Sequence, residues 1–184
     1  MSRRKIGKSR LTGRATFGKS PIIGGATFGK SRLTGRATFG KSKVPLRYVP
    51  MSLSRKDLQK QRKGLLASRR AYKRGVYVPR PHVASFRSKP SKHILKAQRM
   101  YGVKSIVPSQ QLAKATGCSV SALKQIVKKG EGAYYSSGSR PNQTAHSWAY
   151  ARLASAITGG KAAKVDAHIL EKGCKNGHPS RRRR

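Results

Sequence analysis

The pattern of apolar and polar positions changes character at about residue 50. Beyond it, apolar residues recur every three or four positions, which is typical of amphipathic helices. Proline-rich and glycine-rich stretches separate these segments: 76–90 is expected to be an extended connector or edge strand, and 130–142 a loop. The sequence therefore predicts a mainly α fold with a small helical domain. Its predicted helices cover 55–73, a segment after Ser91, a short segment after Ser109, 120–129, 144–158 and 161–172.

Capping residues and apolar faces support these helices. Ser54 is placed to cap the first helix, with Asp57 three residues later as its capping partner, and Thr144 caps the fifth. We expect the second and last helices to bury one face each. The residues predicted on those faces are Ile94, Leu95, Ala97, Met100 and Tyr101 in the second helix, and Val165, Ile169 and Leu170 in the last.

Before residue 50 the pattern becomes an eleven-residue repeat, written three times over 10–42 as RLTGRATFGKS, PIIGGATFGKS and RLTGRATFGKS. Its glycines oppose a helix, and a unit this short cannot bury a core of its own. The repeat is therefore either a disordered basic tail or an extended arm that anchors on a repeating partner. The candidate anchors are Leu11, Phe17, Ile22, Phe28, Leu33 and Phe39, and the cations beside them are Arg14, Lys19, Lys30, Arg36 and Lys41.

Each repeat also contains the phosphate-loop pattern G-x-x-x-x-G-K-S, but the spacing excludes nucleotide binding. Eleven residues leave no room for the strand, glycine turn and helix that present backbone amides to a phosphate. Metal-dependent hydrolysis is disfavoured as well, because the chain's four acidic residues are scattered along the sequence. The sequence predicts a non-enzymatic protein with no cofactor and no metal.

Charge is the dominant compositional feature. The chain has 184 residues with 43 Lys and Arg against four Asp and Glu, a net charge of +39. A charge this large requires an anionic partner: nucleic acid, a membrane surface or an acidic protein face. The candidate contact residues outside the repeat are Arg62, Lys63, Arg69 and Arg70 on the first helix, Arg140 in the loop, and Arg181, Arg182, Arg183 and Arg184 in the tail.

Two cysteines bear on the compartment. Cys118 and Cys174 lie far apart with no close cysteine neighbour, which argues against a disulfide framework and a zinc site and favours a reducing compartment. The chain also contains no apolar run long enough to span a membrane and no hydrophobic signal core.

Residues 109–129 resemble the helix-turn-helix DNA-binding motif. Ser109 caps a short helix, Gly117 takes the turn and Ser119 caps a second helix, which in that motif enters the major groove. The same pair also occurs as a plain structural hairpin. Positions matching the motif's core are Leu112, Cys118, Leu123 and Ile126, and the second helix would present Val120, Ser121, Lys124, Gln125 and Lys128.

The chain from 53 to about 173 resembles an uncharacterised domain family of large double-stranded DNA viruses of algae (phycodnavirus-like). The resemblance rests on LSRKDLQKQ, SRRAYKRG, LAKATGCSVSALKQIVKKGEGAYYSSGSRPNQTAHSW and ARLASAITGGKAAKVDAHIL. It implies a viral origin rather than a mechanism, and the repeat arm lies outside it.

Together these patterns divide the chain into a basic arm with linker (1–50), a basic helical region (51–105), a helical domain with the hairpin (106–175) and a basic tail (176–184).

The favoured function is a non-enzymatic virion structural protein. This would be a minor capsid component on the inner face of the shell, whose arm binds neighbouring subunits. Its partners would be major and other minor capsid proteins, with viral DNA or inner-membrane headgroups as further anions. It would reside inside the capsid shell, and in the host cytoplasm or nucleus during assembly. The alternative is a DNA-binding protein that condenses or organises viral DNA.

Overall fold

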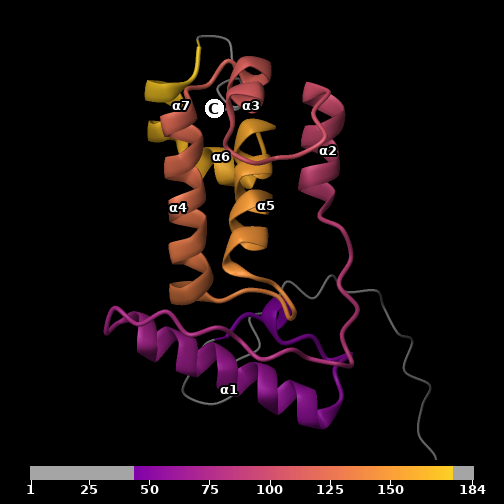
Figure 1. Ribbon diagram of the computed structural model, residues 1–184. Helices are drawn as coiled ribbons and strands as arrows, with labels where there is room; N and C mark the ends of the chain where they lie inside the picture. The colour runs from indigo at the N-terminus through magenta and orange to yellow at the C-terminus, as the bar shows by residue number, and fades with distance from the viewer. Residues whose placement is uncertain (1–43, 176–184) are drawn as a thin grey trace, which may run out of the picture. The chain divides into compact units, whose positions relative to one another are not determined.

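The computed structural model describes residues 44–175, which form helices joined by loops and, between the first two α-helices, by a long extended connector (Figure 1). No strand occurs within this range, so the predicted mainly α class is confirmed. The elements are the short 3-10 helix η1 (Leu46–Tyr48) and the α-helices α1 (Arg55–Tyr72), α2 (Lys92–Tyr101), α3 (Gln110–Thr116), α4 (Val120–Ser137), α5 (Ala145–Ile157), α6 (Lys161–Val165) and α7 (Ala167–Gly173).

The antiparallel pair α4 and α5 forms the centre of the helical core. The two helices approach so closely at Gly130 that a Cβ atom there would lie 2.6 Å from the Cα of Ala149. Leu153 and Ile157 of α5 are fully buried beside Leu123 and other apolar residues of the same cluster. The missing side chain at Gly130 therefore sets the distance between the two central helices.

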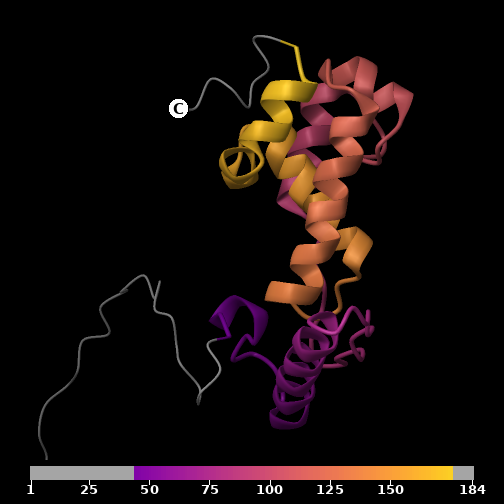
Figure 2. The same cartoon turned by 90° about the vertical axis from the view of Figure 1, so that its left-hand side faces the viewer.

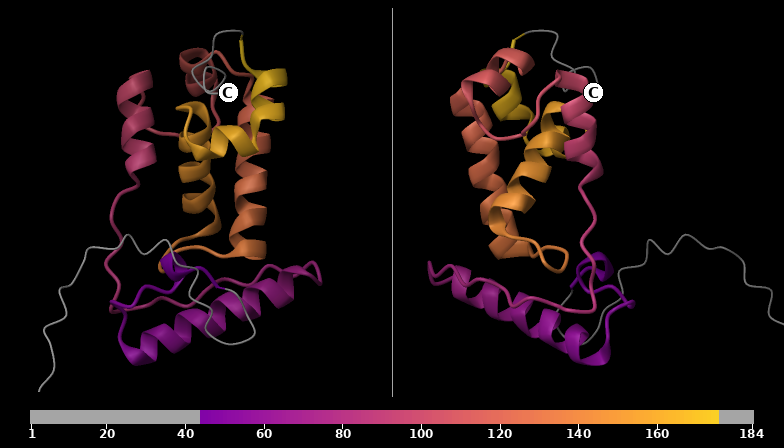
Figure 3. Two further views of the ribbon diagram at one scale, coloured as in Figure 1. Left: turned by 180° about the vertical axis from the view of Figure 1, so that it is seen from behind. Right: turned by 45° about the vertical axis from the view of Figure 1, so that its right-hand side comes forward.

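Helix α2 lies against α5, which places α5 between α2 and α4 (Figure 3). Ala97 is fully buried, and the Tyr101 hydroxyl donates a hydrogen bond of 2.6 Å to the Ile157 carbonyl at the end of α5. Burial raises the pKa of Tyr101 to about 12. Two predictions for this helix were wrong: Leu95 and Met100 are 41% and 45% exposed. The core thus draws on both the 51–105 and the 106–175 regions.

The predicted last helix is broken into α6 and α7 at Asp166 (Figure 2). Ile169 and Leu170 are buried as expected, but Val165 is 60% exposed and does not point inward as predicted. The break turns the Asp166 side chain fully into the interior, where it contacts cations of other helices. The spacing of apolar residues predicted a continuous helix, because it gives no information about an acidic residue that becomes buried.

Helix α1 begins at the predicted cap, but only half of the capping pair forms. The Ser54 hydroxyl accepts from the Asp57 amide at 3.3 Å, whereas the Asp57 carboxylate accepts from the Ser85 amide at 2.8 Å. Hydrogen bonds from the side chain and backbone of Ser85 lower the pKa of Asp57 below its usual value. The carboxylate therefore ties the start of α1 to the 76–90 connector instead of to its own cap.

Two side-chain amides hold the connecting segments in place. Gln61, buried in α1, donates to the carbonyls of Tyr48 at 3.0 Å and Ser139 at 3.4 Å. Asn142 accepts from the Val83 amide at 2.8 Å and donates to the Val83 carbonyl at 2.8 Å. Gln61 thus links α1 to η1 and to the loop between α4 and α5, and Asn142 links that loop to the 76–90 connector, which contains no strand.

The loop predicted over 130–142 was wrong over its first part, because α4 continues to Ser137. Glycine inside a helix costs about 1 kcal/mol relative to alanine, which is why the two glycines predicted an early end. Packing outweighs that cost: Gly130 admits α5, and Gly132 lies beside Tyr72 of α1. Tertiary contacts thus extend the helix beyond what local propensity favours.

Gly130→Ala should lower the free energy of unfolding by about 1–3 kcal/mol, because its methyl group would overlap the backbone of Ala149 and force α4 and α5 apart. Urea unfolding followed by circular dichroism measures this change. Gly132→Ala is the matched control, since its Cβ would meet only the Tyr72 hydroxyl at 3.1 Å, the far end of a side chain and not a backbone atom. Equal stability of the two variants would contradict the close helix crossing.

Candidate nucleic-acid interface

Helices α3 and α4 form a capped hairpin around a tight turn. The Ser109 hydroxyl accepts from the Leu112 amide at 3.2 Å, and the Ser119 hydroxyl accepts from the Ala122 amide at 3.2 Å. Gly117 adopts φ +67° between them, a conformation that glycine takes without steric cost. Both predicted caps and the predicted turn glycine are confirmed. These features fix where α4 begins.

The turn of the hairpin is held covalently by a disulfide between Cys118 and Cys174. Next to it, the Ser119 amide donates to the Gly173 carbonyl at 2.7 Å, so a backbone bond reinforces the link. The expectation of two unpaired cysteines was wrong, and the argument for a reducing compartment falls with it. Sequence spacing failed here because the two residues are 56 positions apart and become neighbours only when α7 packs against α4.

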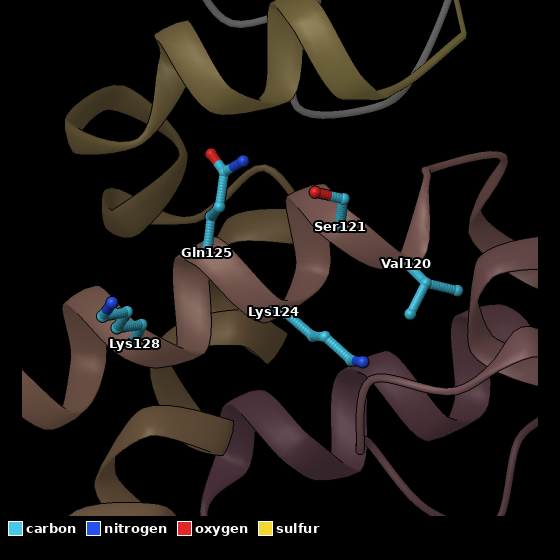
Figure 4. A pocket seen from close by; sticks show the side chains of 5 residues that line it. All are labelled: Val120, Ser121, Lys124, Gln125 and Lys128. Atoms are coloured by element: carbon cyan, nitrogen blue, oxygen red, sulfur yellow. The ribbon is translucent and has the colours of Figure 1, made fainter.

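The first turns of α4 present a polar face around a shallow hollow. Its lining residues are Val120, Ser121, Lys124, Gln125 and Lys128 (Figure 4). Lys124, Gln125 and Lys128 are exposed, whereas Leu123 and Ile126 on the opposite side of the helix are fully buried. These five residues are the ones that the helix-turn-helix resemblance placed at the DNA. We call them the α4 face. It extends over about 12 Å of helix.

Lys129 shows why position within α4 matters for a cation. Its ammonium lies 3.0 Å from the carboxylate of Asp166, which is completely buried. Arg152 of α5 binds the same carboxylate through two hydrogen bonds of 2.8 Å, in a bidentate arrangement. This ion cluster joins α4, α5 and the α6–α7 junction. Lys129 therefore neutralises a buried carboxylate, whereas Lys124 and Lys128 are exposed to solvent.

The four predicted contact cations of α1 do not behave alike. Lys63 and Arg70 are exposed and accessible to an anion. Arg69 instead donates to the Ser137 carbonyl at the C-terminal end of α4, where the helix dipole favours a positive charge. Arg62 is half-buried and engaged within the protein. The basic stripe on α1 is therefore partly structural.

Arg80 joins Arg69 at the end of α4, and the sequence pattern did not single it out. Its guanidinium donates to the Ser139 hydroxyl at 2.6 Å and to the Tyr134 carbonyl, and it stacks 3.9 Å from the centre of the Tyr134 ring. Burial lowers the pKa of Arg80 and raises that of Tyr134. The sequence contained one signal for a fixed position of Arg80: it stands between two prolines in VPRPH, and these restrict the backbone on both sides of it.

The remaining predicted contacts divide by location. Arg140 is exposed in the loop between α4 and α5. The apolar anchors and cations of the 10–42 repeat, and the arginine tail 181–184, lie outside the described residues. Across residues 44–175, no three His, Cys, Asp or Glu side chains come together as a metal site, and no helix is long and apolar enough to cross a membrane.

The fold and surface define a small disulfide-linked helical domain with a basic exposed face. A family model described as a family of unknown function, DUF5824, matches residues 45–171, and the chain belongs to this family. No curated protein and no solved structure matches the chain. The viral origin suggested by the sequence stays a prediction, since the family description does not test it.

Proposed function

We propose that the protein is a non-enzymatic DNA-binding structural protein whose α4 face contacts duplex DNA. The observation that carries this proposal is the arrangement of the α4 face. Two lysines one turn apart and a glutamine between them project from the start of a helix whose other side is anchored in the core. An α-helix presented in this way fits the major groove.

Rigidity of the helix supports this use. A disulfide and a backbone bond hold the turn before α4, and the Asp166 cluster holds the middle of the helix. A preformed helix loses little conformational freedom on binding, so more of its contact energy appears as affinity. The α4 face is therefore suited to bind without folding first.

The composition of the face favours binding to many sequences over selective binding. Glutamine can form two hydrogen bonds with adenine, but a lysine contacts phosphate as readily as guanine. With a net charge of +39, contacts to phosphate dominate the affinity. A protein of this kind condenses or organises DNA, and it does not need to find one site.

Replacing Lys124, Gln125 and Lys128 together by alanine should weaken duplex binding and reduce the slope of log K against log [salt] by about two, one unit for each lost phosphate contact. Fluorescence anisotropy of the full chain with a labelled duplex, over a range of salt concentrations, measures both changes. The charge-matched control is Lys161→Ala/Lys164→Ala on α6, where both side chains are exposed. If the triple variant changes duplex affinity no more than this control does, the proposal fails.

A second candidate function is a minor capsid component, and the repeat favours it. Leucine or isoleucine and phenylalanine recur at a spacing of eleven residues, a pattern that matches equivalent sites on repeating subunits better than it matches DNA. The DUF5824 match begins at residue 45 and does not include the repeat, which accords with a separate role for the arm. The two functions are compatible within one particle.

The capsid role predicts that the protein stays with purified virus shells after nuclease treatment has removed the DNA. We expect the wild-type protein to be retained at low salt. The variant Phe17→Ala/Phe28→Ala/Phe39→Ala should be released, because the phenylalanines, and not charge alone, would anchor the arm on the shell. Gel analysis of sedimented shells measures it, with Thr16→Ala/Thr27→Ala/Thr38→Ala as the neighbouring control. Loss of the wild-type protein together with the DNA would contradict a capsid role.

A further inference from the structure

Four tyrosines gather where the C-terminal ends of α1 and α4 meet. The rings of Tyr72 and Tyr135 are nearly parallel, with centroids 6.1 Å apart, and Tyr77 lies edge-on to both at 5.8 and 5.1 Å. Tyr134 lies edge-on to Tyr135, with ring centroids 4.9 Å apart. Of these rings Tyr77 is exposed, Tyr72 and Tyr135 are half-buried, and Tyr134 is buried. We call Tyr72, Tyr77 and Tyr135 the tyrosine surface.

The tyrosine surface is anchored on the buried Tyr134 and exposes the ring of Tyr77. Tyr134 is 3% exposed, donates from its hydroxyl to the Gln143 carbonyl at 2.9 Å and carries the stacked guanidinium of Arg80. Tyr77, which lies edge-on to Tyr135, is 63% exposed. The ring of Tyr77 is held by two neighbouring rings and is still exposed, so it is available to stack on a ligand.

Three exposed cations lie close in sequence to Tyr72 and Tyr77. Arg70, Lys73 and Arg74, all exposed, come from the last turn of α1 and the residues just after it. The nearest acid along α4 is Glu131, one turn before Tyr135, but its carboxylate lies 2.7 Å from His146 on α5 and is engaged there. The charge at this surface therefore favours an anion that also offers flat apolar faces.

We propose that the tyrosine surface binds the unpaired bases of single-stranded nucleic acid. Bases in a duplex stack on one another and hide their faces, whereas a single strand leaves them free to stack on aromatic rings while its phosphates meet lysine and arginine. Tyr77 supplies the exposed ring, Tyr72 and Tyr135 hold it in place, and the three cations follow the backbone. This site is distinct from the α4 face and does not depend on duplex binding there.

The test compares two strands of equal charge. Full-length protein is titrated into a labelled oligothymidine of about 12 nucleotides and into an abasic strand of the same length, at a salt concentration that screens the basic arm. The wild type should bind oligothymidine more tightly than the abasic strand by about 5- to 100-fold. Tyr77→Ala should remove most of that difference, and Tyr77→Phe, which keeps the ring, should retain it.

Several outcomes would overturn the proposal. The preference for bases could be absent in the wild type, survive in Tyr77→Ala, or fall equally in Leu95→Ala, a control at an exposed apolar residue of α2. Binding of phosphatidylserine vesicles that depends on Tyr77, without any base preference, would assign the surface to a membrane. The α4 triple alanine variant should keep the preference for bases, so failure of duplex binding at α4 and failure here are distinguishable.

Discussion

Asp166 places a completely buried carboxylate between Lys129 of α4 and Arg152 of α5, at the point where α6 ends and α7 begins. Removing a charge from water costs several kcal/mol, and the cost is offset only when partners and hydrogen bonds are well placed. In a chain with 43 basic and four acidic residues, such a buried acid is a strong constraint. It fixes which cations face inward, breaks the last helix and holds α4 in register with α5.

The basic residues of the described part fall into two groups. Lys129, Arg152, Arg69 and Arg80 satisfy internal acceptors: a carboxylate for the first pair, and backbone carbonyls at the end of α4 for the second. Other cations, on the α4 face and beside the tyrosine surface, remain exposed. Total charge alone predicts that a polyanion binds. Only the structure distinguishes the cations that hold the fold from those that are available to a partner.

Local signals in the sequence predicted local features well. The caps at Ser109, Ser119 and Thr144 and the turn at Gly117 depend on nearest neighbours along the chain, and all of them form as expected. Features that depend on distant residues were not predictable. They include the extension of α4, the Cys118–Cys174 disulfide, the placement of Arg80, and the tyrosine surface, whose rings come from three separate segments.

The most direct measurement is the free energy of unfolding of Asp166→Asn in the full chain, determined by urea denaturation at neutral pH beside Asp57→Asn. Asn keeps the size of the side chain but removes the charge that compensates Lys129 and Arg152. We expect a loss of about 3 kcal/mol for Asp166→Asn and a much smaller loss for Asp57→Asn, whose carboxylate is open to solvent. Equal stability of Asp166→Asn and the wild type would show that this buried carboxylate does not hold α4, α5 and the α6–α7 junction together.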